Sequence, residues 1–512
     1  MYLRQWLLWC TLLSGVVHAE EPPAAYQNQS RALHLLQQVV SAHFGAKQPL
    51  MNTSLTAQYR SEMVIYGHYR YPGESRPLDL KGEVILHPRG AVMRKTQTRA
   101  EEWQAKIGPS VFKWRAGEEG VQVADDERNE GGSLLRSLPQ AVLMEALRQR
   151  HTLIWIGGEV IDGKDHDTLA FTPQGQLTFF LAIQRDSKLL RKVSVLEAHP
   201  GYGDVVHQVE YLDYADFEGF TLPKIRLAKE YGRTYRWQET MSFTGFSWVR
   251  GSAFAAWPRE IRAALTQRPS ESEVAMEVHH LGKDLFALAL PEHDAKSLLI
   301  GFADFAVLLE VGHGSPQGEA LLRKANFLLP DKPLRYVSFS HHHPTYTWGL
   351  RPFIASGVSI LAAPKNEEYL KGLAARPHLL QPDRLAQNPK TPKIKTVDGQ
   401  IRITDGQRSL AIFDLGLTSQ HTENYLVFYL EDEALLFVGD LGYFPMENRE
   451  LRAGPRLRGL PDFLHNKGIE PKMVTQSWPY KGQKMLIPYA DIKAAVQRES
   501  APATERPPTG QR

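Results

Sequence analysis

The stretch from Ser338 to Leu350 reads S-F-S-H-H-H-P-T-Y-T-W-G-L and contains three consecutive histidines. An apolar run from Leu334 to Phe339 leads into it and predicts a strand. Side chains at alternate positions of a strand point to the same face, so we expect His341 and His343 to lie on one side. Neutral imidazole is a good zinc ligand, so the stretch indicates a metal site. The alternative is a polar loop with a chance run of histidines.

The composition is that of an ordinary soluble protein. The chain has 512 residues, which predicts two or three domains, and it is 42% hydrophobic and 23% charged. Its formal net charge of +3 is small for this length and argues against a dedicated binder of nucleic acid or of acidic membranes. We therefore expect a small-molecule substrate or ligand as partner. The sequence does not specify protein partners.

Residues 1–19 have the pattern of a cleavable signal peptide. Arg4 supplies the positive start, Trp6 to Val17 form a short apolar core, and Val17-His18-Ala19 is a small-x-small cleavage site. The apolar core is shorter than the about 20 residues that a spanning helix needs, so we expect no transmembrane segment after signal removal. Cys10 is the single cysteine and would be removed with the signal, which favours a bacterial periplasm. The alternative is an uncleaved anchor.

Residues 20–260 are predicted to form a β-rich domain with a curled antiparallel sheet. Gln29 to Phe44 has apolar residues at helical spacing, and Leu134 to Arg150 also favours a helix. Most of the remainder reads as short strands with turns between them. Asp213 to Pro223 resembles a hairpin of periplasmic β-sheet domains that curl around lipophilic cargo. The alternative, which we favour, is a packing domain without a ligand of its own.

The composition changes after residue 260. Residues 261–274 are predicted to be a linker that proteases cut first. Strands and helices alternate from 275 to 495 after a β-rich start, which predicts a layered α/β domain. Residues 496–512 are rich in Pro, Thr, Glu and Arg, and are predicted to be a disordered tail.

Three ordered blocks in the second half resemble the signature of the metallo-β-lactamase superfamily. His341 to Leu350 stands in place of its H-x-H-x-D-H and Gly-Gly-Leu, and Leu417 to Asn424 (L-T-S-Q-H-T-E-N) looks like its G-x-x-H-T-x-x-N segment. Leu435 to Asp440 (L-L-F-V-G-D) looks like its L-F-x-G-D segment, and Val307 to Glu310 occupies the place of an early strand. The resemblance covers about residues 275–495. It implies a layered αββα fold, with two sheets between helices.

The resemblance implies one complete metal site and one that is mostly lost. The family positions that hold the first zinc are His341, His343 and His421, and all three are present. The Asp and His that hold a second metal are replaced by Thr345 and Tyr346. The last family histidine should fall within Val474 to Gly482, which contains none. Asp440, which bridges two metals in the family, is retained.

These residues predict one zinc ion and two alternative functions. Three imidazoles and a water form a catalytic type of zinc site, in which the pKa of the bound water falls to about 7. Asp440 would be a fourth ligand or an orienting base, and Tyr346 would donate a hydrogen bond to a developing oxyanion. The favoured function is a mono-zinc hydrolase of unknown substrate that uses a metal-activated water. The alternative is a non-catalytic protein that binds a ligand or partner on a degenerate metallo-hydrolase fold.

Further histidines and tryptophans have structural explanations beside functional ones. His342 is expected to point away from the site and pack, and His313 is expected to be a loop histidine. His465 is a candidate replacement for the missing ligand, although a surface helix explains it equally well. Trp348 and Trp478 are candidates to line a pocket, but aromatic residues beside clefts more often belong to the core.

Overall fold

The computed structural model describes most of the chain. Described are 24–45, 53–87, 90–97, 100–107, 110–116, 121–125, 132–173, 177–232, 237–250, 274–446 and 450–500, with Arg259 and Ala263. The predicted signal peptide and most of the predicted linker lie outside the described residues. So do residues 501–512 of the predicted tail, whereas 496–500 belong to the last helix.

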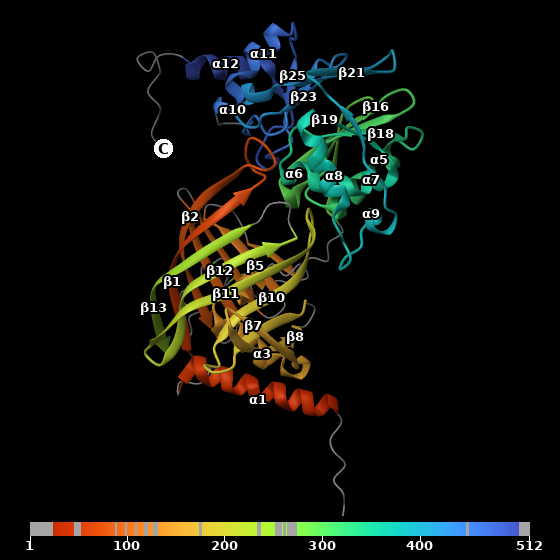
Figure 1. Cartoon of the computed structure of the whole chain (residues 1–512). Helices are drawn as coiled ribbons and strands as arrows, with labels where there is room; N and C mark the ends of the chain where they lie inside the picture. The colour runs from red at the N-terminus through yellow and green to blue at the C-terminus, as the bar shows by residue number, and fades with distance from the viewer. Residues whose placement is uncertain are drawn as a thin grey trace, which may run out of the picture.

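The N-terminal half contains an antiparallel sheet of thirteen described strands (Figure 1). The strands follow the chain in two runs that meet where β1 pairs with β13. The first run is β1 (Thr53–Tyr66), β2 (Ser75–His87), β3 (Gly90–Gln97), β4 (Ala100–Ile107), β5 (Ser110–Arg115) and β6 (Gln122–Asp125). The second run is β7 (Ile154–Ile161), β8 (Lys164–Phe171), β9 (Phe179–Gln184), β10 (Leu190–His199), β11 (Gly203–Phe217), β12 (Phe220–Tyr231) and β13 (Gln238–Arg250). The predicted β-rich character is confirmed.

Helices cover one face of this sheet. In α1 (Ala24–Phe44), apolar residues recur three and four positions apart, and Leu36 and Val39 are completely buried. The predicted helix at Leu134 to Arg150 is interrupted, because Pro139 cannot continue a hydrogen-bonded helix and instead begins α3 (Pro139–Arg148) after α2 (Gly132–Leu135). One hydrophobic core joins these helices to the strands. None of the described helices is long and apolar enough to cross a membrane.

The C-terminal half contains two sheets with helices beside them. The first sheet has β14 (Glu277–Gly282), β15 (Leu285–Leu290), β16 (Ala295–Gly301), β17 (Ala306–Leu309), β18 (Leu334–Ser338), β19 (Ser359–Ala362) and β20 (Lys393–Thr396). The second has β21 (Gln400–Thr404), β22 (Ser409–Asp414), β23 (Leu426–Leu430), β24 (Leu435–Phe437), β25 (Met473–Thr475) and β26 (Ile487–Pro488). The helices are α5 (Ser315–Leu328), α6 (Pro344–Thr347), α7 (Arg351–Ser356), α8 (Glu367–Ala375), α9 (Arg384–Gln387), α10 (Pro455–Arg458), α11 (Leu460–Asn466) and α12 (Tyr489–Ser500).

Three hydrophobic cores hold this half together. One core joins side chains of both sheets, including Leu309 and Phe428. A second lies between the first sheet and helices α5, α7 and α8, and a third between the second sheet and helices α11 and α12. Strands and helices alternate in this half after a β-rich start, as the sequence predicted.

The two halves meet along loops at one end of the N-terminal sheet (Figure 1). The Asp204 amide donates to the Pro377 carbonyl at 2.8 Å. A Cβ at Gly203, where φ is +73°, would lie 1.9 Å from that carbonyl oxygen, so only glycine fits. A Cβ at Gly201 would lie 2.2 Å from the Trp348 indole, which is the second close approach between the halves. The junction is therefore tightly packed around this loop.

Candidate metal centre

The three consecutive histidines lie in a loop after a strand. Strand β18 ends at Ser338, so the expectation that His341 and His343 alternate on a strand is wrong. Buried hydrogen bonds fix the loop instead. The Ser338 hydroxyl donates to the Leu361 carbonyl at 2.8 Å, and the Ser340 amide donates to Oε1 of Glu310 at 3.2 Å.

The loop nevertheless brings the predicted side chains together. His341, His343, His421 and Asp440 each offer one ligand atom, and these atoms all lie within 4.8 Å of one another. Oδ2 of Asp440 lies 3.4 Å from Nε2 of His421 and 3.9 Å from Nε2 of His341. His421 follows η8 (Gly416–Ser419), and Asp440 follows β24, so the site joins loops of both sheets.

The two ring nitrogens of each histidine in this cluster differ in their hydrogen bonding. Nδ1 of His341 shares a hydrogen bond with the Ser340 hydroxyl at 2.9 Å, while its Nε2 is buried without a partner among the described residues. Nε2 of His421 is likewise buried; its contact within the described structure is with Oδ2 of Asp440 at 3.4 Å, and it makes no other hydrogen bond there. Nε2 of His343 lies 3.4 Å from the Tyr69 carbonyl oxygen of the N-terminal half. Metal-binding histidines commonly donate one N–H to such an acceptor and present the other nitrogen to the ion.

Burial keeps imidazoles of the loop neutral. Loss of hydration lowers the pKa of His341 and of His343 well below 6.5. It also lowers the pKa of His342 to about 3. A neutral imidazole has the free electron pair that a metal ion requires. The donor set of three imidazoles and one carboxylate therefore fits a zinc ion.

Asp440 has two protein partners besides the histidines. The Tyr425 hydroxyl donates to Oδ1 at 2.8 Å, and Nη1 of Arg456 donates to Oδ2 at 2.8 Å. Burial opposes ionisation, but the neighbouring His341, His421 and Arg456 hold the pKa of Asp440 below its usual range.

A glycine places Asp440 at this point. Gly439 has a φ of +59°, and a Cβ there would lie 2.6 Å from the Ser340 hydroxyl. Only glycine adopts this conformation without cost while leaving room for the histidine loop. The glycine of the L-L-F-V-G-D block is therefore explained by close approach of the two loops.

The substituted positions lie beside the cluster and add no charge to it. Tyr346 is 3% exposed, packs in a hydrophobic core and has its ring centroid 4.7 Å from that of His341. Burial, and then the charge of Asp440, raise the pKa of Tyr346 well above 10, so the phenol stays protonated. Its predicted contact with a substrate would require the ring to move, and that role stays a prediction.

The other candidate residues lie outside the cluster. His342 is buried, and its ring centroid lies 6.5 Å from that of Tyr369, as expected for packing. His313 stacks on His293 at 4.8 Å, and His465 is exposed on α11. Of the candidate residues, His341, His343, His421 and Asp440 converge, whereas His342, His313 and His465 are not part of that group. Trp348 packs against His199 at the junction of the halves, and Trp478 is 43% exposed.

Three neighbours of the site were not anticipated from the sequence. Arg456 is sixteen positions from Asp440, and Tyr425 lies in a strand-like run, so neither stands in a recognisable motif. The third is the turn after β1, where the His68 ring lies 5.3 Å from that of His343. No sequence signal links positions 68 and 343, because tertiary packing alone brings them together.

Comparisons with known proteins give likenesses to two kinds of structure. No family model matches the chain, and no curated protein matches it. A metallo-beta-lactamase from Pontibacter korlensis is 16% identical with a TM-score of 0.33, covering 44% of this chain and 98% of that one. FIM-1 metallo-beta-lactamase from Pseudomonas aeruginosa, solved in a mono-zinc form, is 17% identical with a TM-score of 0.32, covering 44% and 94%. A LolA superfamily protein from Nitrosomonas europaea is 8% identical with a TM-score of 0.33, covering 45% and 98%. TM-scores this low do not establish a shared function.

Proposed function

We propose that this chain is an exported hydrolase that holds one zinc ion at His341, His343 and His421, with Asp440 as fourth ligand or orienting base. One observation carries the proposal. Four ligand atoms lie within 4.8 Å of one another, and in the described part of the chain the buried Nε2 atoms of His341 and His421 face only the Asp440 carboxylate, at 3.9 and 3.4 Å. Each unsatisfied buried polar group costs roughly 1–3 kcal/mol. A single ion at the point of convergence offsets that cost.

The residues of the site have separate roles in this proposal. A bound zinc ion would supply a Lewis acid and a water of lowered pKa. Ser340 and the Tyr69 carbonyl orient His341 and His343 through their second nitrogens. Asp440, held by Tyr425 and Arg456, keeps its carboxylate oxygen beside the histidines and can accept a proton there. An ester, lactone, amide or phosphoester of a small molecule would suit this chemistry.

Charge balance supports one ion instead of two. A second dication would find Thr345, which is uncharged, and Tyr346, which burial keeps protonated. The carboxylate of Asp440 is already paired with the Arg456 guanidinium. An ion with so few charged ligands would not recover the hydration that it loses on binding.

The domain organisation is part of the proposal. Residues 275–495 would be a metallo-β-lactamase-like domain with αββα layers, which the two sheets and their three cores support. Residues 20–260 would be a separate β-rich domain joined by the linker 261–274. Residues 1–19 would direct export to a periplasm and be removed.

A non-catalytic ligand-binding protein is the second candidate. The pairing of Asp440 with Arg456 favours it, because a carboxylate held by a guanidinium is a weaker base and a weaker ligand. In that case the histidines would bind an ion or ligand without turnover.

Elemental analysis of the purified mature protein after zinc reconstitution separates these functions. One zinc per chain, with hydrolysis of model esters, is the expected result. Two equivalents would refute the single site, and none would shift the assignment to the non-catalytic binder. The double variant Thr345→Asp with Tyr346→His should take up a second ion, because it restores two family ligands. Folding of this variant needs to be checked, since Tyr346 packs in the core.

A further inference from the structure

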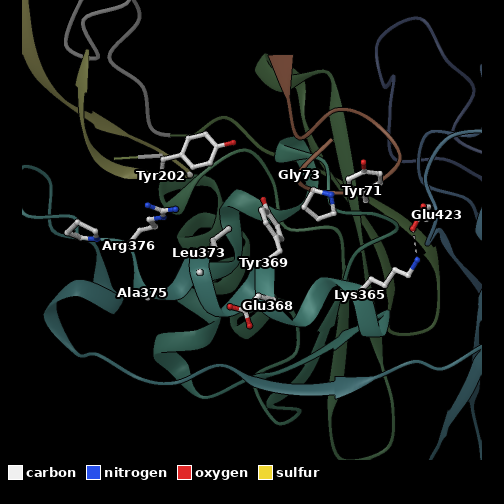
Figure 2. A pocket seen from close by; sticks show the side chains of 14 residues that line it. Tyr71, Gly73, Tyr202, Lys365, Glu368, Tyr369, Leu373, Ala375, Arg376 and Glu423 are labelled. Carbon is white, nitrogen blue, oxygen red and sulfur yellow. Dashed lines mark hydrogen bonds and ion pairs between the residues drawn. The ribbon is translucent and has the colours of Figure 1, made fainter. Parts of the chain in front are cut away.

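A cavity of about 780 Å³ lies where the two halves of the chain meet (Figure 2). Both halves build it. The turn after β1 contributes Tyr71, the loop before β11 contributes Tyr202, and helix α8 contributes Tyr369 and Gly372. Figure 2 shows Tyr369 between Tyr202 on one side and Tyr71 on the other. The volume is within the range of sites that enclose most of a drug-sized ligand, and such sites favour domain junctions.

The cavity adjoins the metal centre through two short connections. Glu423 lines the cavity two positions after His421, and its amide donates to the Arg70 carbonyl at 2.8 Å. The Tyr369 hydroxyl shares a hydrogen bond of 2.9 Å with the Thr347 hydroxyl, which donates to the His343 carbonyl at 3.1 Å. One wall of the cavity therefore belongs to the same hydrogen-bonded loops as the histidine cluster.

The junction that frames the cavity is fixed by specific contacts. The Asp204 carboxylate accepts from the Leu379 amide at 2.6 Å and from the Leu380 amide at 3.2 Å. Together with the close approaches at Gly201 and Gly203, these bonds lock the loop before β11 against the chain after α8. These contacts between the two halves therefore fix the walls of the cavity relative to each other.

The lining selects for an uncharged, apolar group. More of the wall is apolar than polar, and three tyrosine rings offer flat surfaces for stacking. The four charged side chains are Lys365, Arg376, Glu368 and Glu423, so their formal charges cancel. Lys365 is paired with Glu423 at 2.5 Å, and Arg376 donates to the Gly232 carbonyl. The lining therefore has no net charge that would favour an anionic ligand over a neutral one.

We propose that this cavity is the substrate cleft of the metal centre, an inference that rests on the proposed hydrolase function. The cleft takes the aromatic or similarly flat apolar part of a neutral ester, lactone or amide. The N-terminal half then selects the substrate, while the C-terminal half supplies the reacting groups. This assignment explains why the turn after β1 lies over the cluster.

A matched pair of fluorescent probes tests the assignment on the full mature chain. N-phenyl-1-naphthylamine is neutral, and 8-anilino-1-naphthalenesulfonate has the same ring skeleton with a negative charge. The neutral probe should bind saturably and at least tenfold more tightly than the anion. It should also raise KM for a 4-nitrophenyl ester without changing kcat.

The variant Gly372→Trp fills the cavity, because a Cβ at Gly372 meets no atom within 4 Å. It should weaken binding of the neutral probe at least tenfold and leave the zinc content unchanged. Lys371→Trp is the matched control on the exposed side of α8 and should bind like the unmodified protein. Gly372→Leu repeats the test with a smaller group in case the tryptophan variant fails to fold.

The outcomes separate this inference from the hydrolase proposal. Any one of three results would overturn the cleft assignment. The Gly372 variants could bind the neutral probe like the unmodified protein, the anion could bind more tightly than the neutral probe, or the neutral probe could bind without any effect on KM. A chain that binds zinc and hydrolyses esters while its Gly372 variants behave normally keeps the hydrolase and loses the cleft. A chain without zinc or hydrolysis loses both the hydrolase function and the role of the cavity as a substrate cleft, even if the probe binds there.

Discussion

The N-terminal sheet and the C-terminal half each bury a histidine completely, and the two rings differ in what their nitrogens meet. In α1, Nε2 of His43 accepts from the Leu190 amide at 3.0 Å, and Nδ1 lies 3.3 Å from the Thr221 carbonyl. In the histidine loop, Nδ1 of His341 meets Ser340, and Nε2 meets no partner among the described residues. Equal burial thus accompanies a structural role in one half and the proposed ligand role in the other. The nitrogen without a hydrogen bond, and not the burial, is what makes His341 a candidate ligand.

Removing a proposed ligand should have the largest effect. His421→Ala should reduce the zinc content from one equivalent to near zero, because two imidazoles and a carboxylate bind less tightly than the full set. It should also remove the stabilisation by zinc, about 4 kcal/mol at a thousandfold excess over the dissociation constant. Elemental analysis and thermal unfolding with and without zinc measure both effects. His465→Ala, at an exposed histidine, should retain zinc, and retention by His421→Ala would remove that residue from the site.

Removing the structural histidine should give the opposite result. His43→Ala leaves the Leu190 amide and the Thr221 carbonyl without their partner and opens space in the core, so the free energy of unfolding should fall by about 2–4 kcal/mol. Zinc content should stay at one equivalent. Denaturant unfolding of the full chain measures the loss, with the exposed His34→Ala on the same helix as control. A loss of zinc in His43→Ala would break the comparison between the halves.

Acid should destabilise the fold through His43. Burial lowers its pKa from 6.5 to about 4, so the unfolded chain takes up a proton before the folded chain does. The contribution is complete above pH 6.5 and is lost as the pH falls from 6.5 to about 4. At roughly 1.4 kcal/mol per pKa unit, the loss approaches about 3 kcal/mol. Unfolding free energies of the unmodified protein and of His43→Gln, compared between pH 7 and about 4, measure it. A glutamine keeps a donor and an acceptor without titrating, so equal pH slopes in the two proteins would contradict the prediction.

The smallest effect is expected at the guanidinium beside Asp440. Arg456→Ala removes the cation that pairs with the carboxylate, so Asp440 should become a better metal ligand and the affinity for zinc should rise about 10-fold, within the range for neighbours of metal ligands. Arg456→Lys should restore the affinity of the unmodified protein. Arg458→Ala, on the same helix but paired with Glu499, is the control. Competition with a chelator measures affinity, and unchanged affinity in Arg456→Ala would exclude this role for the guanidinium.

Local sequence patterns predicted many elements but not their interruptions. The apolar spacing in α1 predicted a helix, which is confirmed, because residues on one face of a helix recur at every third or fourth position. Strand β7 was not anticipated, because glycines at 157 and 158 weaken its pattern and its side chains are only partly buried. The predicted helix after Leu134 divides at Pro139, where the proline ring fixes the first turn of α3.

The sequence by itself determined the donor chemistry, that is, which side chains could hold a metal. Tertiary structure decided the rest. It replaced the expected strand by a loop that points the histidines together, and it brought Arg456 and the turn after β1 to the site. These partners are separated by sixteen and by more than two hundred positions, and no local pattern encodes such pairs. Only the packing of the sheets and their loops against one another brings these partners within contact distance.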